Sequence, residues 1–226
     1  MNEAEKLVLI AENEQRVYEA GQKEMWKCTT ANGTRAKYDY AFQYTDLTYF
    51  EPKTGIAPTT APYMFANSIG AVDLADKFKK NGVSLDFSNC SAFTRTFYNS
   101  KITKLGVIDC TSAKALDFTF GIMPNLHTIE KWIVDADNTF SNTFSSDSAL
   151  EYIRCEGVIA NDISFASCKK LTHDSIINDE GTGIINVLDT LESGVTRTLT
   201  LCPENSKNLT EDEKKIAKEK GWTLLS

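Results

Sequence analysis

The chain has 226 residues and is 42% hydrophobic, which is enough to bury one substantial core, and we expect one elongated domain. Its formal net charge of −7 at pH 7 repels phosphate backbones and anionic membrane surfaces, so no nucleic acid is expected among its partners. Its apolar runs are all far shorter than the roughly 20 residues of a membrane-spanning helix. No membrane insertion is therefore expected.

Residues 1–27 are predicted to form an amphipathic helix. Residues 3–25 contain no Pro, and Leu7, Ile10 and Val17 fall on one side at helical spacing. We expect this stripe to dock on a partner or to mediate homo-oligomerisation, and packing against the chain's own domain is an equal alternative. The apolar run 7–10 is too short for the core of a signal peptide and has acidic neighbours, so no signal peptide is expected.

Residues 28–68 are rich in Tyr, Thr, Gly and Pro, which predicts an irregular aromatic connector that caps the following domain. Tyr38, Tyr40, Phe42 and Tyr44 alternate with other residues, as one face of a strand would. We expect the aromatic side chains to pack over the start of the next domain, and a binding surface is the alternative.

A repeat occupies residues 69–171. Phe97, Phe120, Phe144 and Phe165 are spaced by 23, 24 and 21 residues. Each is followed five or six positions later by an aliphatic residue, and in three units a second aliphatic comes three positions after that. The predicted repeat core comprises Phe97, Ile102, Leu105, Phe120, Leu126, Ile129, Phe144, Leu150, Ile153, Phe165 and Leu171. Alternation is expected to continue through Val107 in the first unit and Cys155 in the third.

Each unit is too small to bury its own apolar side chains, so neighbouring units must stack to form a continuous core. The spacing predicts an α/β repeat fold, a right-handed solenoid in which every unit contributes one short parallel strand and one return arc. A conventional β-sandwich with similar strand spacing is the alternative.

Residues 172–226 are predicted to cap the solenoid with helices and a strand. Helical stretches are expected at 174–177 and 184–191, followed by an alternating strand at 198–201. Thr210 and Glu213 have the spacing of a capping box at the start of a last helix. Gly221 is expected to end that helix in a left-handed conformation, with Trp222 folding back on it.

No convergent set of catalytic groups is evident, and we expect no catalytic, cofactor-binding or metal-binding residue. His127 is expected to face solvent, and the adjacent residues His173, Asp174 and Ser175 cannot assemble into a hydrolase triad on a helix. Asp135 and Asp137 resemble the opening of a calcium loop that lacks its remaining ligands. The six cysteines have no CxxC pair, which favours buried free thiols, with three disulfides as the alternative.

The segments 144–153 and 165–171 resemble the F-x-x-C-x-x-L-x-x-I signature of BspA-like leucine-rich repeats, common in surface proteins of gut bacteria and their prophages. Segments 9–21, 32–42, 85–88, 106–109 and 220–223 look like those of phage minor structural, tail-associated repeat proteins. Lys131 departs from the pattern, because a third inward residue is expected there. The resemblance implies a short leucine-rich-repeat-like solenoid and identifies no catalytic residue.

The resemblance also implies a function. We expect a non-enzymatic phage virion or tail-associated protein, assembled in the host cytoplasm, that presents its repeat surface for protein or glycan recognition. Its expected partners are other virion proteins, through the N-terminal helix, and a host-surface protein or glycan. The alternatives are a bacterial surface or secreted leucine-rich-repeat adhesin and, further away, a glycan-acting hydrolase on a repeat scaffold.

Overall fold

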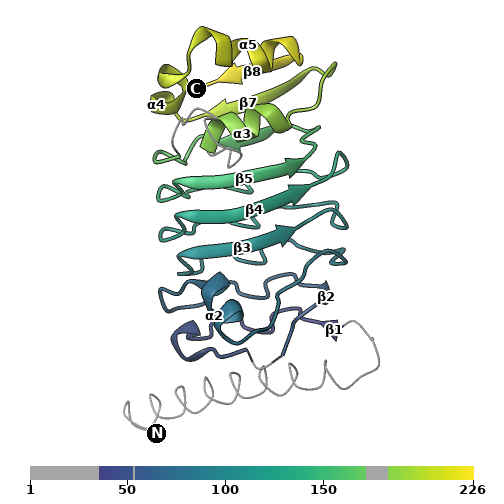
Figure 1. Cartoon of the computed structure of the whole chain (residues 1–226), viewed down its shortest axis with the longest axis vertical. Helices are drawn as coiled ribbons and strands as arrows, with labels where there is room; N and C mark the ends of the chain where they lie inside the picture. Colours follow the sequence, from purple (N-terminus) through teal and green to yellow (C-terminus); the bar gives the residue numbers. More distant parts are fainter. Residues whose placement is uncertain (1–35, 53, 172–182) are drawn as a thin grey trace, which may run out of the picture.

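Short parallel strands stacked along one axis form the body of the protein (Figure 1). The computed structural model describes residues 36–52, 54–171 and 183–226. The predicted N-terminal helix with Leu7, Ile10 and Val17, the predicted helix at 174–177 and the triad-like residues from His173 lie outside the described residues. Within the described ranges, no helix combines the length and the apolar character that crossing a membrane requires.

The fold is mixed α/β with three parallel sheets, β1-β2, β3-β4-β5 and β6-β7-β8. In chain order the elements are β1 (Ala36–Lys37), η1 (Leu47–Tyr49), β2 (Pro58–Thr60), α2 (Leu74–Lys80), β3 (Lys104–Asp109), β4 (Thr128–Val134), β5 (Tyr152–Gly157), β6 (Ile163–Phe165), α3 (Gly183–Thr190), β7 (Arg197–Leu201), α4 (Pro203–Asn208), α5 (Glu211–Glu219) and β8 (Trp222–Leu225). The predicted short parallel strands, the helix predicted at 184–191 and the predicted last helix are thus confirmed.

A stack of phenylalanine rings runs along the core. Ring centroids lie 5.8 Å apart between Phe97 and Phe120, 5.2 Å between Phe120 and Phe144, and 4.6 Å between Phe144 and Phe165, all near parallel. Phe42 and Phe65 continue the stack toward the N-terminus, at 5.1 Å from each other and 5.6 Å from Phe65 to Phe97. The stack therefore begins inside the segment that the sequence assigned to a connector.

The inward residues of the central sheet are Leu105 and Ile108 in β3, which pair with Ile129 and Trp132 in β4. The predicted inward position of Val107 is wrong, because its side chain is half exposed. Successive inward positions are three residues apart in β3 and β4 instead of the usual two, whereas in β5 they are two apart, and a bulge in the β4-β5 pairing absorbs the difference. The same bulge explains why Lys131 points outward.

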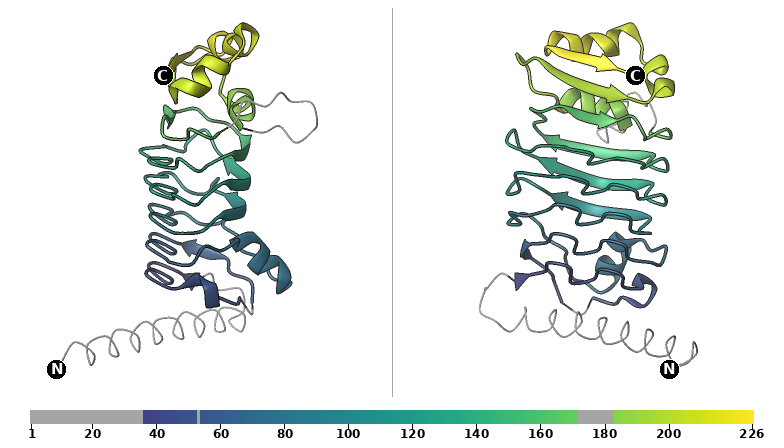
Figure 2. Two further views of the ribbon diagram at one scale, coloured as in Figure 1. Left: turned by 90° about the vertical axis from the view of Figure 1, so that its left-hand side faces the viewer. Right: turned by 180° about the vertical axis from the view of Figure 1, so that it is seen from behind.

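The arcs opposite the strands consist of linked turns (Figure 2). Each of five consecutive arcs contains two non-glycine residues with positive φ, four positions apart, such as Tyr40 and Tyr44 in the first arc. The alternation of Tyr38, Tyr40, Phe42 and Tyr44 therefore does not mark a strand, because these residues lie in the first arc. Amides at alternate positions donate across to the next arc, for example Phe42 N to Met64 O at 2.7 Å, so the arcs bond to one another as strands do.

The C-terminal segment covers the last turns of the stack. α3 packs on β5, and Asn186 Nδ2 donates to Cys155 O at 2.6 Å. The predicted capping box is confirmed, since Thr210 and Glu213 satisfy each other's amides at the start of α5. Gly221 has φ of +91°, as predicted. A Cβ at this position would lie 1.9 Å from Val195 O, so the position requires glycine. Trp222 opens strand β8, and its indole donates to Glu192 O.

Candidate functional site

The outer face of β3-β4-β5 presents charged side chains on three aligned strands. Side chains that do not enter the core project from it, and five of them form ion pairs. Together with the exposed Val107, these five make up the set Lys104, Val107, Glu130, Lys131, Arg154 and Glu156. We call this set with its strands the outer sheet face. Because the strands are parallel and aligned, equivalent positions of neighbouring turns fall side by side on it.

Two ion pairs cross the outer sheet face from strand to strand, and a third lies within β5. Lys104 Nζ lies 2.6 Å from Glu130 Oε1, and Lys131 Nζ lies 2.9 Å from Glu156 Oε1. Arg154 Nε is 3.3 Å from the same Glu156 oxygen. The hydrogen bond that Lys104 donates to Glu130 raises the pKa of Lys104. Each of these side chains remains about one third to one half exposed, so a ligand can reach its charge.

Helix α2 borders this face at β3. Its N-cap is Asp73, whose carboxylate accepts the amide of Asp76 at 2.8 Å, and the helix buries Leu74 and Phe78 one turn apart. Lys77 anchors the helix to the preceding turn by donating to the carbonyls of Thr48 and Phe50, and burial lowers its pKa.

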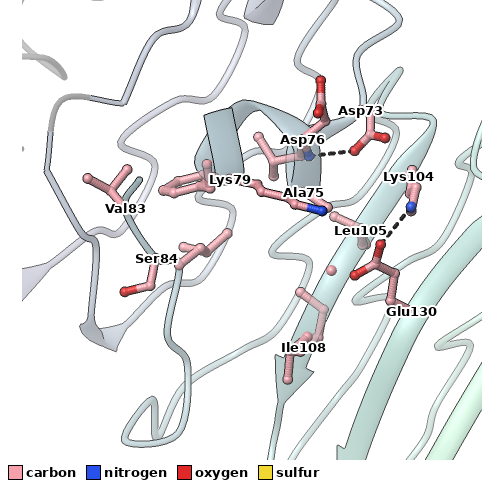
Figure 3. A pocket seen from close by; sticks show the side chains of 15 residues that line it. Asp73, Ala75, Asp76, Lys79, Val83, Ser84, Lys104, Leu105, Ile108 and Glu130 are labelled. Carbon is pink, nitrogen blue, oxygen red and sulfur yellow. Dashed lines mark hydrogen bonds and ion pairs between the residues drawn. The ribbon is translucent and has the colours of Figure 1, made fainter. Parts of the chain in front are cut away.

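Gly106 lets α2 approach the sheet closely. A Cβ at this position would lie 3.3 Å from the Cβ of Ala75, so a larger residue would push the helix away from β3. The two elements enclose a recess of about 390 Å³ between them (Figure 3). Leu74, Phe78 and Ile108 are among the residues that line it. The pair of Lys104 with Glu130 stands at its edge (Figure 3). An apolar floor beside a charged edge suits the side chain of a bound protein or a sugar ring.

The residues predicted as repeat core are all buried, none more than 1% exposed. They support the outer sheet face from behind and are not available to a ligand. His127 is exposed just before β4, with no acid or nucleophile bonded to its ring among the described interactions. Asp135 and Asp137 lie in a turn in which Asp135 Oδ1 accepts the amide of Asp137. Across residues 36–52, 54–171 and 183–226, no three His, Cys, Asp or Glu side chains gather as a metal site would require.

Cysteine chemistry is also absent from the outer sheet face. Among the described residues, Cys90, Cys110, Cys155, Cys168 and Cys202 are free and buried. Burial raises the pKa of Cys90 to about 12 and raises that of Cys110 and Cys155 further. Thiols held in the protonated form are poor nucleophiles, so these cysteines act as small apolar core residues.

Sequence reasoning missed two features of the site. Helix α2 was not predicted, although Asp73 followed by the pair Leu74 and Phe78 and by a run of lysines is the pattern of a capped short helix. The outward position of Val107 was missed because nothing in a single strand reveals a three-residue step.

Comparison with protein-family models, with curated proteins and with solved structures found no match to this chain.

Proposed function

We propose that the protein is a non-enzymatic recognition protein, built as a short right-handed leucine-rich-repeat-like solenoid, whose outer sheet face binds another protein or a glycan. One parallel strand per unit of 21 to 24 residues, with the phenylalanine stack behind the strands, supports this architecture. The residues of the outer sheet face can vary without disturbing the core that holds them.

The observation that carries the proposal is the set of charged pairs on the outer sheet face. Exposed ion pairs contribute only about 0 to 1 kcal/mol to stability, so folding alone gives little reason for several charged side chains on neighbouring strands. Lys104, Glu130, Lys131, Arg154 and Glu156 instead offer a pattern of alternating charge on rigid strands, beside an apolar recess. Such a pattern supplies specificity in protein and glycan recognition.

We also propose that the chain is a phage virion or tail-associated component, docked or oligomerised through its N-terminal segment. This part of the proposal depends on the resemblance to phage minor structural proteins and on the apolar stripe of Leu7, Ile10 and Val17.

Binding by the outer sheet face is testable with a charge-reversed variant. We would label the full chain and the triple variant Lys104→Glu, Lys131→Glu, Arg154→Glu, and measure adsorption to a panel of intact gut bacteria by flow cytometry. The matched control is Lys214→Glu, Lys215→Glu, Lys218→Glu on α5, which makes the same charge change elsewhere. We expect the first variant to lose adsorption by tenfold or more and the control to keep it. Equal adsorption by both variants, or none by the full chain, would refute this role.

Particle association is tested by density-gradient sedimentation of phage particles produced with the full chain or with a chain lacking residues 1–27. We expect the full chain to sediment with particles and the truncated chain to stay at the top of the gradient, with an unchanged unfolding temperature. A full chain that never sediments with particles would contradict the virion assignment and leave the binding role to its own test.

A further inference from the structure

The side of the stack formed by the arcs, away from β3-β5 (Figure 2), contains a column of aromatic rings around one arginine. Tyr40, Tyr63, Arg95 and Phe118 are the first positive-φ residues of four consecutive arcs. The amides of Tyr40, Tyr63 and Arg95 donate to the next arc in each case, which holds these backbone positions in line. The side chains therefore follow one another along the stack, and we call them the arc column.

Contacts within the arc column fix the arginine. The rings of Tyr40 and Tyr63 stack at 5.0 Å with an angle of 12°. The Arg95 guanidinium carbon lies 5.6 Å from the Tyr63 ring centroid and 4.9 Å from that of Phe118, and the Tyr98 ring is 5.8 Å away. Arg95 Nη1 also donates to the Tyr63 hydroxyl at 2.5 Å. A guanidinium held between rings loses little conformational freedom on binding a ligand.

The charge of Arg95 is not matched by an acid within the described part of the chain. Of the other described arginines, Arg154 pairs with Glu156, and Arg197 donates to the carbonyls of Ala160 and Thr196. Arg95 has one hydrogen bond, to a phenol, and three aromatic neighbours. A guanidinium has five N–H donors, so the remaining donors of Arg95 can bind a carboxylate in the two-pronged manner that its planar shape favours.

The surroundings of Arg95 select among carboxylates. The patch offers one cation in a chain of net charge −7, so a polymer with many closely spaced acids is repelled by the overall field. The neighbouring rings offer apolar contact, and Tyr40 is 54% exposed. A sugar ring that has one carboxylate beside an apolar C–H face matches both features, because the carboxylate meets Arg95 while the C–H face packs on an aromatic side chain.

We infer that the arc column is a binding site for an acidic sugar, a carboxylated pyranose such as a uronic or sialic acid residue of a glycan, with Arg95 as the carboxylate receptor. Tyr63 positions the guanidinium through its hydroxyl. This site lies on the arcs and not on the outer sheet face, so it does not depend on the function proposed above.

The test is calorimetric titration of the full chain with the methyl glycosides of galacturonic acid and of N-acetylneuraminic acid, each of which has one carboxylate on one sugar ring. The methyl esters of both probes keep the rings and remove the charge. We expect at least one free acid to bind, its ester to bind about tenfold more weakly or worse, and Arg95→Gln to lose affinity by a similar factor. Tyr63→Phe keeps the ring stack and removes only the hydroxyl, and we expect it to weaken binding several-fold.

The matched control is Arg154→Gln, which removes an arginine from the opposite face and should leave the affinity unchanged. Unfolding temperatures of the variants show whether each folds, and Tyr63→Phe keeps the test decisive if Arg95→Gln does not. The inference is overturned if neither acid binds at millimolar concentration, or if ester and acid bind equally. It is also overturned if Arg95→Gln binds as well as Arg154→Gln, or if a tetra-glutamate peptide binds as tightly as the sugars.

Discussion

We predict that Asp147 makes the protein less stable as pH rises from about 4 to about 8. Its side chain is fully buried, three positions after Phe144 in the sequence. One carboxylate oxygen accepts the amide of Met123 at 2.8 Å, and the other has no hydrogen-bond partner in the described structure. Burial raises the pKa of Asp147 from 3.8 to about 8, and the Met123 amide opposes the shift. The buried thiol of Cys168 is the nearby titratable group, and its pKa is raised by burial and then by Asp147.

The sign of the effect follows from proton linkage. The folded state holds a proton that the unfolded state releases near pH 4. The contribution of Asp147 to the free energy of unfolding is therefore most favourable below pH 4 and is lost as pH rises to about 8. Each pH unit is worth about 1.4 kcal/mol, so the span from pH 4 to pH 7 amounts to at most about 4 kcal/mol. Asp147→Asn keeps an oxygen for the Met123 amide and removes the titration.

Urea unfolding of the parent chain and Asp147→Asn at each pH from 4 to 9 measures this difference. We expect the two chains to have similar stability at pH 4 and the variant to gain steadily, to several kcal/mol by pH 8. Asp137→Asn, at an exposed turn position, serves as the control and should follow the parent chain. A stability difference that stays constant across the range would show that Asp147 does not titrate as its burial implies.

Three further substitutions test the packing and the backbone. Phe120→Ala removes a ring that stacks on Phe97 and Phe144, and we expect a loss of about 3 to 5 kcal/mol in urea unfolding; a loss below about 1 kcal/mol would contradict the ring stack. Ile122→Asn should raise the unfolding temperature, with a gain of about 1 kcal/mol, because a β-branched residue is strained at φ of 59°. Thr210→Ala should cost about 1 kcal/mol in thermal unfolding by removing the cap of α5, and Thr210→Ser should restore most of it.

The spacing of phenylalanines was enough to predict short parallel strands in a stack. A ring at one fixed place in each unit can be buried only if the units lie one above another, and the described rings do so from Phe42 to Phe165. The capping box at Thr210 and the left-handed Gly221 were predictable because both are local and need no tertiary information.

The arcs could not be predicted, because their conformation contradicts local preference. Tyr40, Phe118 and Ile122 adopt positive φ although such side chains avoid that region, and the bonds to neighbouring arcs hold them there. The arc column was missed for the same reason, since Tyr63 and Arg95 come together only through the stacking of arcs 32 residues apart. Asp147 stands where Cys168 stands in the next unit, three residues after a core phenylalanine, yet sequence alone does not reveal its burial.

The stacking of equivalent units is tested most directly by deleting one of them. Removing residues 120–143 joins Thr119 to Phe144, which restores the Thr-Phe pair found at 119–120 and 143–144 and takes out β4. β3 would then pair with β5. Asn161 Nδ2 would donate to the carbonyls of Cys110 and Ala113, to which Asn138 Nδ2 donates in the parent chain. We predict a shorter chain that unfolds in one cooperative urea transition, with a smaller dependence on urea concentration than the parent chain. A deletion variant without a cooperative transition would contradict the stack.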